Sequence, residues 1–215
     1  MCIRDRIHIV DRYFQPTHPL GVKNDGKGLD YFIPGNNEVT IDELPHHHQN
    51  GFVVIVVGAK FATKSMTAES IITLCEKIAQ PIVLLGGPAE RAKGEKIAET
   101  VGTKAFNACG KYNINQSASL LKKSQKVITP DTGLMHIAVA LNKEVISIWG
   151  NTVKDFGMFP YPKSASEKPD ENHIVEVKNL SCRPCSKIGF AGCPKGHFDC
   201  MNLIDLDEVA NLAAN

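Results

Sequence analysis

The sequence predicts an α/β fold, a Rossmann-like parallel sheet with flanking helices. Short apolar runs alternate with helical patterns from residue 52 onward, and this rhythm is typical of βαβ units. The first run, residues 52–57, is continuous and rich in β-branched residues, as expected for a strand buried on both faces. Glycines end two later runs, at Gly86 and Gly150, where the chain must turn towards the next element.

The individual elements follow from the hydrophobic period. Apolar residues recur at helical spacing between residues 71 and 78, which predicts a helix with one buried face. We expect a closing helix near Asp205, because Asp205 and Glu208 have the spacing of a capping box. The expected strands are 52–57, 82–85, 105–106, 127–129, 145–149 and 174–177, and the further expected helices are 89–101, 117–123 and 134–141.

We expect residues 1–50 to consist of an N-terminal scar followed by an interdomain connector. The first six residues, MCIRDR, resemble a translated adapter scar, so we expect the chain to be the C-terminal part of a longer protein. Pro16 and Pro19 stop any helix that begins near residue 7. We interpret His46-His47-His48 as solvated linker, because no other ligand cluster lies nearby in the sequence. The folded domain is therefore expected at 51–215, with a Cys-rich tail segment at 181–201.

Composition excludes several classes of protein. The 215 residues carry a net charge of +1 and are 43% hydrophobic and 22% charged, which is ordinary for a globular domain. Nucleic-acid binding would need a basic excess that is absent, and the longest apolar run is too short to be a transmembrane segment. No secretory signal is visible at the N-terminus, so we expect a cytoplasmic location.

Ligands are expected at the carboxyl ends of the strands, as in other doubly wound sheets. Lys60 and Lys64 follow the first strand, and taken alone either one fits a solvated surface lysine. Pro88 suits the first turn of a helix, which places Glu90 in that turn. There Glu90 fits two roles equally well: a favourable charge at the helix dipole or an acceptor for a ribose diol.

A third strand end carries the residues TPDTGLMHIA, 129–138. Asp131 or Thr132 is placed to cap the following helix, and Gly133 lets a ligand approach the first helical N–H groups. Those N–H groups favour a phosphate or diphosphate, and His136 projects from the first turn towards the same mouth. With a lysine and a glutamate at two neighbouring strand ends, the stretch predicts an anion site rather than a plain helix cap.

These motifs together resemble glycosyltransferase family 9, the ADP-heptose:lipopolysaccharide heptosyltransferase family. The resemblance rests on residues 131–141 and 146–152, and on residues 58–64 and 86–90 upstream of them in the right order. The cysteine segment 182–201 also resembles a tail found in many members. The resemblance implies that this chain is the C-terminal, nucleotide-sugar-binding half of a GT-B glycosyltransferase.

The resemblance also implies roles for single residues and partners. It assigns donor and phosphate binding to Lys64, Asp131, Thr132, Gly133 and His136, and ribose binding to Glu90. The implied reaction is an inverting, metal-independent sugar transfer, in which a nucleoside diphosphate is displaced and the site stabilises its charge. The implied donor is ADP-heptose, and the implied acceptor is of lipopolysaccharide-core type, which allows peripheral contact with the inner membrane. The family's base is an aspartate of the N-terminal domain, so the catalytic base is unknown here and the chain is expected to bind nucleotide without transferring sugar.

Four cysteines cluster near the C-terminus in the pattern C-x2-C-x7-C-x6-C, at Cys182, Cys185, Cys193 and Cys200. Four thiolates can hold a structural zinc ion tetrahedrally, although the second pair is spaced more widely than usual. The alternative is a loop of free thiols packed as small hydrophobic groups. Two other functions also stay open: a GT-B-type nucleotide-sugar epimerase or hydrolase, and a non-catalytic, zinc-stabilised binding module.

Overall fold

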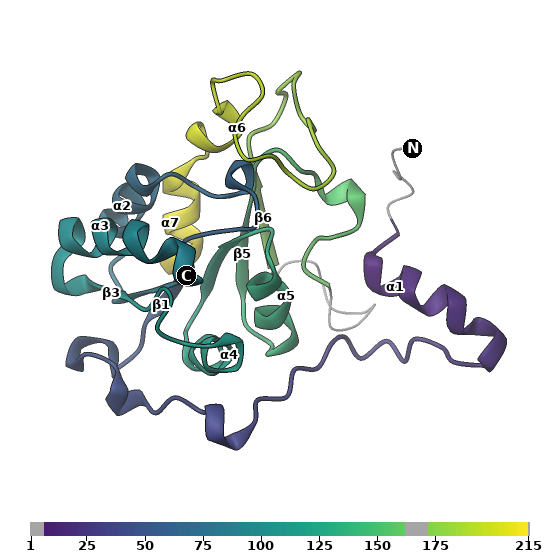
Figure 1. Ribbon diagram of the computed structural model, residues 1–215, viewed down its shortest axis with the longest axis horizontal. Coiled ribbons are helices and arrows are strands. Elements are labelled where there is room, and N and C mark those ends of the chain that lie inside the picture. The colour runs from purple at the N-terminus through teal and green to yellow at the C-terminus, as the bar shows by residue number, and fades with distance from the viewer. Residues whose placement is uncertain (1–6, 162–171, 215) are drawn as a thin grey trace.

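The central feature of the fold is one six-stranded parallel sheet with the strand order β3-β2-β1-β4-β5-β6 (Figure 1). The computed structural model describes residues 7–161 and 172–214, so the expected scar at 1–6 lies outside the described residues. The strand order is that of a doubly wound Rossmann sheet, which confirms the predicted fold class. The strands are β1 (Val53–Val56), β2 (Ile82–Leu85), β3 (Ala105–Asn107), β4 (Val127–Pro130), β5 (Val145–Trp149) and β6 (Asn172–Glu176).

The strand residues are buried on both faces of the sheet, as their apolar runs predict. In β1, Val53 and Ile55 belong to one hydrophobic core, while Val54 and Val56 belong to the other. Neighbouring side chains alternate between the faces because a strand has a period of two. All five strand pairs are parallel, so the carboxyl ends of β1, β2 and β4 lie side by side at one edge.

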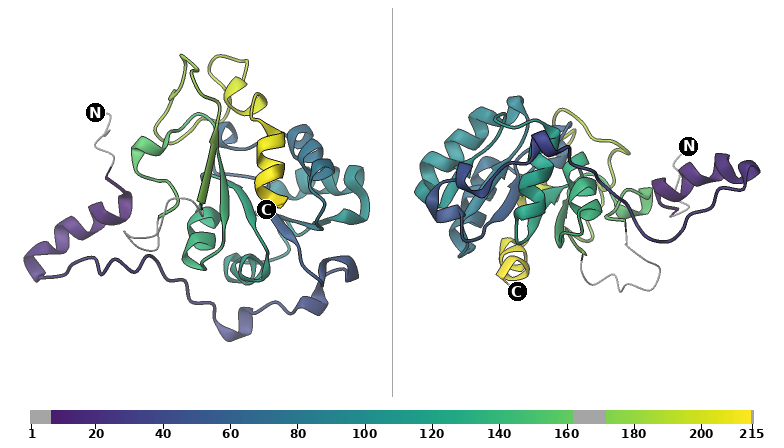
Figure 2. Two further views of the ribbon diagram at one scale, coloured as in Figure 1. Left: turned by 180° about the vertical axis from the view of Figure 1, so that it is seen from behind. Right: turned by 90° about the horizontal axis from the view of Figure 1, so that it is seen from below.

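Helices cover both faces of the sheet (Figures 1 and 2). One layer contains α2 (Ala68–Lys77), α3 (Arg91–Val101) and α7 (Leu206–Ala214), and the other contains α4 (Ile114–Lys123) and α5 (Gly133–Ala140). The short helix α6 (Asp199–Asn202) lies in the tail that leads to α7. No helix in the described ranges is long and apolar enough to span a bilayer.

Side-chain caps set the start of several helices. The carboxylate of Asp205 accepts hydrogen bonds from the backbone N–H groups of Asp207 and Glu208, both at 3.0 Å, which confirms the expected start of the closing helix. Helix α4 begins before the expected residue 117, because Asn113 and Gln116 form a reciprocal capping box ahead of it.

The N-terminal segment is partly an arm that stands away from the sheet (Figure 2). Helix α1 (Ile9–Phe14) ends before Pro16, as predicted, and a 3-10 helix (Gln15–Leu20) follows it. The solvated-linker interpretation of the three histidines is wrong for His48, although His46 and His47 are exposed. His48 is completely buried, its Nε2 lies 3.0 Å from the carbonyl oxygen of Ile82 in β2, and its ring lies edge-on to the Phe106 ring of β3.

Candidate functional site

The main candidate site is a cleft at the carboxyl ends of β1, β2 and β4, with a volume of about 690 Å³. We call it the α5 cleft, because the first turn of α5 forms one of its walls. Gly58 and Lys60 line it after β1, Gly86 and Gly87 line it after β2, and residues 132–134 line it after β4. The cleft therefore lies at the switch point of the strand order, where doubly wound sheets bind their ligands.

The N-terminus of α5 opens into this cleft without a side-chain cap. Thr132 occupies the N-cap position, but its hydroxyl accepts no backbone N–H and instead lies 3.3 Å from the Thr129 hydroxyl. Gly133 is exposed, and a Cβ added to it would meet nothing within 4 Å. Thr132 is thus the N-cap residue, as expected, but neither its side chain nor that of Asp131 caps the helix. The first N–H groups of the helix remain available to an anion.

Glu90 forms the opposite side of the α5 cleft. It ends a short 3-10 helix (Pro88–Glu90) that precedes α3, and its side chain lies against the backbone of Gly58. A Cβ at Gly58 would be only 2.2 Å from the Glu90 Cγ atom, so only glycine lets the two strand ends approach this closely. The carboxylate is half-buried, and it lies in the same cleft as the start of α5.

Lys64 and Asp131 form an ion pair next to this cleft. The Lys64 Nζ atom is 2.6 Å from Asp131 Oδ2, and the two side chains are only 12% and 7% exposed. The Thr152 hydroxyl donates to the same carboxylate oxygen at 3.3 Å. The carboxylate of Asp131 is therefore paired with side chains instead of capping α5, and the cation of Lys64 already has a counter-charge.

His136 lies on the first turn of α5, near this ion pair. Burial lowers the pKa of His136 below its usual value of 6.5, the Asp131 carboxylate opposes the shift, and Lys64 adds to it. The predicted residues thus form one neighbourhood. Glu90, Thr132 and Gly133 line the α5 cleft, whereas Lys64, Asp131 and His136 are not among its lining residues.

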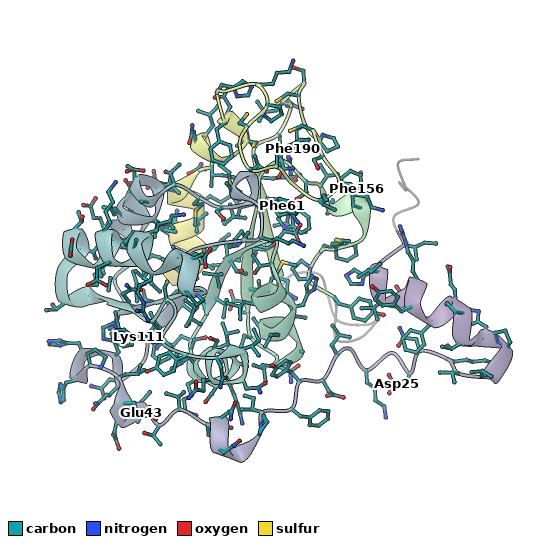
Figure 3. All side chains as sticks on the ribbon, viewed as in Figure 1. Asp25, Glu43, Phe61, Lys111, Phe156 and Phe190 are labelled. Atoms are coloured by element: carbon teal, nitrogen blue, oxygen red, sulfur yellow. The ribbon has the colours of Figure 1, made fainter. Side chains whose placement is uncertain are left out.

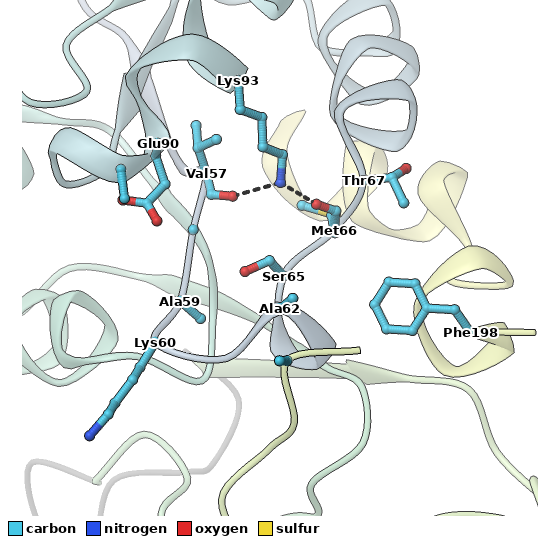
Figure 4. A pocket seen from close by; sticks show the side chains of 13 residues that line it. Val57, Ala59, Lys60, Ala62, Ser65, Met66, Thr67, Glu90, Lys93 and Phe198 are labelled. Carbon is cyan, nitrogen blue, oxygen red and sulfur yellow. Dashed lines mark hydrogen bonds between the residues drawn. The ribbon is translucent and has the colours of Figure 1, made fainter. Parts of the chain in front are cut away.

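Lys93 is a residue of this region that the sequence did not predict. From α3 its ammonium group donates to the carbonyl oxygens of Val57, at 3.0 Å, and Met66, at 2.5 Å (Figure 4). It lines a second cleft of about 520 Å³, the Lys93 cleft, which shares Gly58 and Glu90 with the α5 cleft. Burial lowers the pKa of Lys93, while the Glu90 carboxylate opposes that shift. In the sequence it resembles any surface lysine of an amphipathic helix.

The tail packs against the loop that follows β1. Thr63 and Phe190 exchange hydrogen bonds: the backbone N–H of Phe190 donates to the Thr63 hydroxyl at 2.8 Å, and that hydroxyl donates to the Phe190 carbonyl at 3.1 Å. A Cβ at Gly189 would lie 2.5 Å from the Phe61 Cβ atom. Figure 3 shows Phe61 and Phe190 at the same end of the sheet. The tail therefore helps to position the loop that carries Lys60 and Lys64.

The four clustered cysteines are free thiols. Burial, together with the neighbouring thiols of Cys185 and Cys193, raises the pKa of Cys200 to about 11. The Cys182 sulfur lies 3.8 Å from the His197 Nε2 atom. Among residues 7–161 and 172–214, no three His, Cys, Asp or Glu side chains are arranged to hold a metal ion.

Comparison with known sequences finds one family. A model described as glycosyltransferase family 9 (heptosyltransferase) matches residues 6–187. The lipooligosaccharide heptosyltransferase 2 of Haemophilus influenzae is 26% identical over 162 residues, which are 74% of this chain and 40% of that protein. The lipopolysaccharide heptosyltransferase 2 of Escherichia coli is 29% identical over 79 residues, 35% of this chain and 23% of that protein. The chain thus spans less than half the length of these curated relatives.

Solved structures share the fold. A family 9 glycosyl transferase from Veillonella parvula aligns with a TM-score of 0.74 at 18% identity, covering 99% of this chain and 60% of that one. An Escherichia coli heptosyltransferase solved with ADP aligns with a TM-score of 0.59 at 22% identity, covering 80% of this chain and 51% of that one. At these identities the likeness shows a common fold.

Proposed function

The chain belongs to glycosyltransferase family 9, and on that premise we propose that the α5 cleft binds the nucleoside diphosphate of a nucleotide-sugar donor. The observation that carries the proposal is the shared cleft of an uncapped helix N-terminus and a glutamate. The N–H groups of α5 suit the diphosphate, and the Glu90 carboxylate suits a ribose diol. Both groups line one cleft of about 690 Å³, with Glu90 following β2 and α5 following β4 on either side of β1, so both contacts are available to one ligand.

The proposed reaction is an inverting sugar transfer from ADP-heptose to a lipopolysaccharide-core acceptor. The donor is supported by the printed names of the relatives, which are heptosyltransferases, and by a related structure that contains ADP-2-deoxy-2-fluoro heptose. In this proposal Asp131 holds hydroxyl groups of the sugar. Lys64 and the start of α5 stabilise the negative charge that develops on the departing diphosphate, with His136 assisting, and no metal is required.

The geometry of the ion pair fits these two roles. A carboxylate that is held by Lys64 and Thr152 has its remaining lone pairs in a fixed direction. A lysine held by Asp131 keeps its charge at one place in the site. Both groups are thus ordered before the donor arrives, which is what electrostatic stabilisation of a leaving group requires.

We further propose that this chain alone binds the nucleotide without transferring the sugar. The resemblance assigns the base to an aspartate of the N-terminal domain, and no residue of the present chain was matched to it. The acceptor carries a lipid, so the proposed location is the cytoplasmic face of the inner membrane. Heptosyl transfer by the purified chain would contradict the first of these two proposals.

Titration calorimetry with ADP, UDP and GDP tests the nucleotide proposal. We expect ADP to bind most tightly, and binding to weaken in Lys64→Ala and in Asp131→Ala. Exposed Lys23 provides a matched control, since Lys23→Ala removes the same charge from a residue that does not line the cleft. Absence of ADP binding, or equal binding by the wild-type chain and both site variants, would contradict the proposal.

A structural zinc ion on the four tail cysteines also stays a proposal. Its support is the spacing of Cys182, Cys185, Cys193 and Cys200, which supplies the four thiolates of a tetrahedral site. The described side chains are not arranged as ligands, so the ion would have to draw the thiols together. A stoichiometric zinc assay on the purified chain decides: about one zinc ion per chain supports the proposal, and none contradicts it.

A further inference from the structure

The α5 cleft has an unbalanced charge once a diphosphate enters it. This inference rests on the proposed function and concerns the same site. The Lys64 cation is already matched by Asp131 at 2.6 Å, so the pair contributes little net charge. The N-terminus of α5 supplies only about half of an elementary charge, whereas a nucleoside diphosphate carries several negative charges.

Lys60 is the cation that the cleft itself offers. Among the described residues that line the α5 cleft, it is the one with a positively charged side chain. It is exposed, and the ion pairs among the described residues leave it without a carboxylate partner. Its ammonium lies 5.8 Å from the centre of the Phe61 ring, near the outer limit of a cation–π contact.

The backbone that carries Lys60 is anchored on both sides. Lys93 donates to the carbonyl of Val57 before the loop and to that of Met66 after it (Figure 4). Thr63 is tied to Phe190 of the tail by reciprocal hydrogen bonds. Lys60 therefore combines a fixed backbone position with a free, charged side chain, which is a suitable arrangement for meeting an incoming anion.

We propose that Lys60 makes the ionic contact with the donor's diphosphate and so determines specificity for a diphosphate over a monophosphate. The helix N-terminus binds one phosphate by its N–H groups, and Lys60 neutralises the charge that remains. Lys64 keeps its proposed role beside the charge that develops on the leaving group, as half of an ion pair that is ordered before binding. Lys60 binds the donor in this account and takes no part in proton transfer.

Calorimetry of the full chain with ADP, AMP, adenosine and inorganic pyrophosphate tests this. Lys60→Met keeps the length and apolar stem of the side chain, and Lys60→Arg keeps its charge. Lys23→Met is the matched control, because it removes one positive charge from an exposed lysine of the N-terminal arm. We expect Lys60→Met to weaken ADP and pyrophosphate binding about tenfold, the effect of one charge-assisted contact at an exposed position.

The pattern across ligands separates an ionic contact from a structural role. AMP should lose less affinity than ADP in Lys60→Met, adenosine should lose none, and Lys60→Arg should restore ADP binding. The salt dependence of ADP binding should also be smaller in Lys60→Met than in the wild type. Equal ADP binding by Lys60→Met and the wild type, or an equal loss for adenosine, would overturn the role of Lys60. If the wild-type chain binds pyrophosphate through Lys60 but not ADP, the role of Lys60 stands and the proposed nucleotide specificity falls.

Discussion

Replacing Gly58 with alanine should expel Glu90 from the α5 cleft. An added Cβ would lie 2.2 Å from the Glu90 Cγ atom, 2.5 Å from Cδ and 2.6 Å from Oε1. These separations are far below van der Waals contact. All three atoms belong to a flexible side chain, so the side chain can rotate away while the backbone keeps its position.

The expected loss is in nucleotide affinity rather than in stability. A hydrogen bond to a charged group contributes about 1.5 to 3 kcal/mol, so the displaced carboxylate should weaken ADP binding about tenfold to a hundredfold. Rotation of a half-buried glutamate should change the free energy of unfolding by less than about 1 kcal/mol. The loss of binding and the retention of stability are therefore expected in the same variant.

Calorimetry with ADP on four variants measures this. They are Gly58→Ala, Glu90→Ala, the double variant, and Gly192→Ala as a control in which the added Cβ meets nothing within 4 Å. If Gly58→Ala acts only through Glu90, the double variant should bind no more weakly than Glu90→Ala. Wild-type affinity in Gly58→Ala, or losses that add in the double variant, would refute the reasoning.

Three further predictions concern stability and the packing of the tail. Asp131→Ala should lower the free energy of unfolding by about 3 kcal/mol, because it leaves the Lys64 charge buried and unpaired. The control is Glu69→Ala, which breaks the ion pair with Lys96, where the side chains are 70% and 60% exposed, and it should cost less than about 0.5 kcal/mol. Equal losses of the two variants in urea unfolding would contradict this prediction. Burial lowers the pKa of His48 below 6.5, so the unfolded chain binds more protons and stability should fall as the pH drops below 6.5. His48→Gln should flatten that decline in urea midpoints measured across pH, and an unchanged slope would count against it. Thr63→Val should speed proteolysis of the tail by removing the two hydrogen bonds between the Thr63 hydroxyl and Phe190, while the backbone bond between the two residues remains. An unchanged cleavage rate would argue against that coupling.

The strands were predictable because each buried strand is a short run of consecutive apolar residues. A run such as residues 53–56 is apolar at every position, short and rich in β-branched residues, which is typical of a strand covered on both faces. The start of α4 was missed by three residues because Asn113 and Gln116 act through a pair of hydrogen bonds and not through an apolar period. His48 was missed because its burial depends on β2, which follows more than thirty residues later.

The residues of the candidate site were predictable from the sequence, but the ion pair and hydrogen bonds between them were not. The alternation of strands and helices placed Glu90 and Gly133 at the carboxyl ends of strands, and both line the α5 cleft, although β1 lies between the two strands that precede them. That Asp131 pairs with Lys64 instead of capping α5 depends on where two distant loops meet. The same holds for Lys93, whose carbonyl partners Val57 and Met66 come from a different part of the chain. Local periodicity carries no information about such contacts.

A crystal structure of this chain with ADP tests the central claim most directly. The account predicts diphosphate oxygens within hydrogen-bonding distance of the backbone N–H groups at the start of α5. It also predicts that the ribose hydroxyls lie on the Glu90 carboxylate. ADP bound outside the α5 cleft, or bound there without contact to either group, would contradict it.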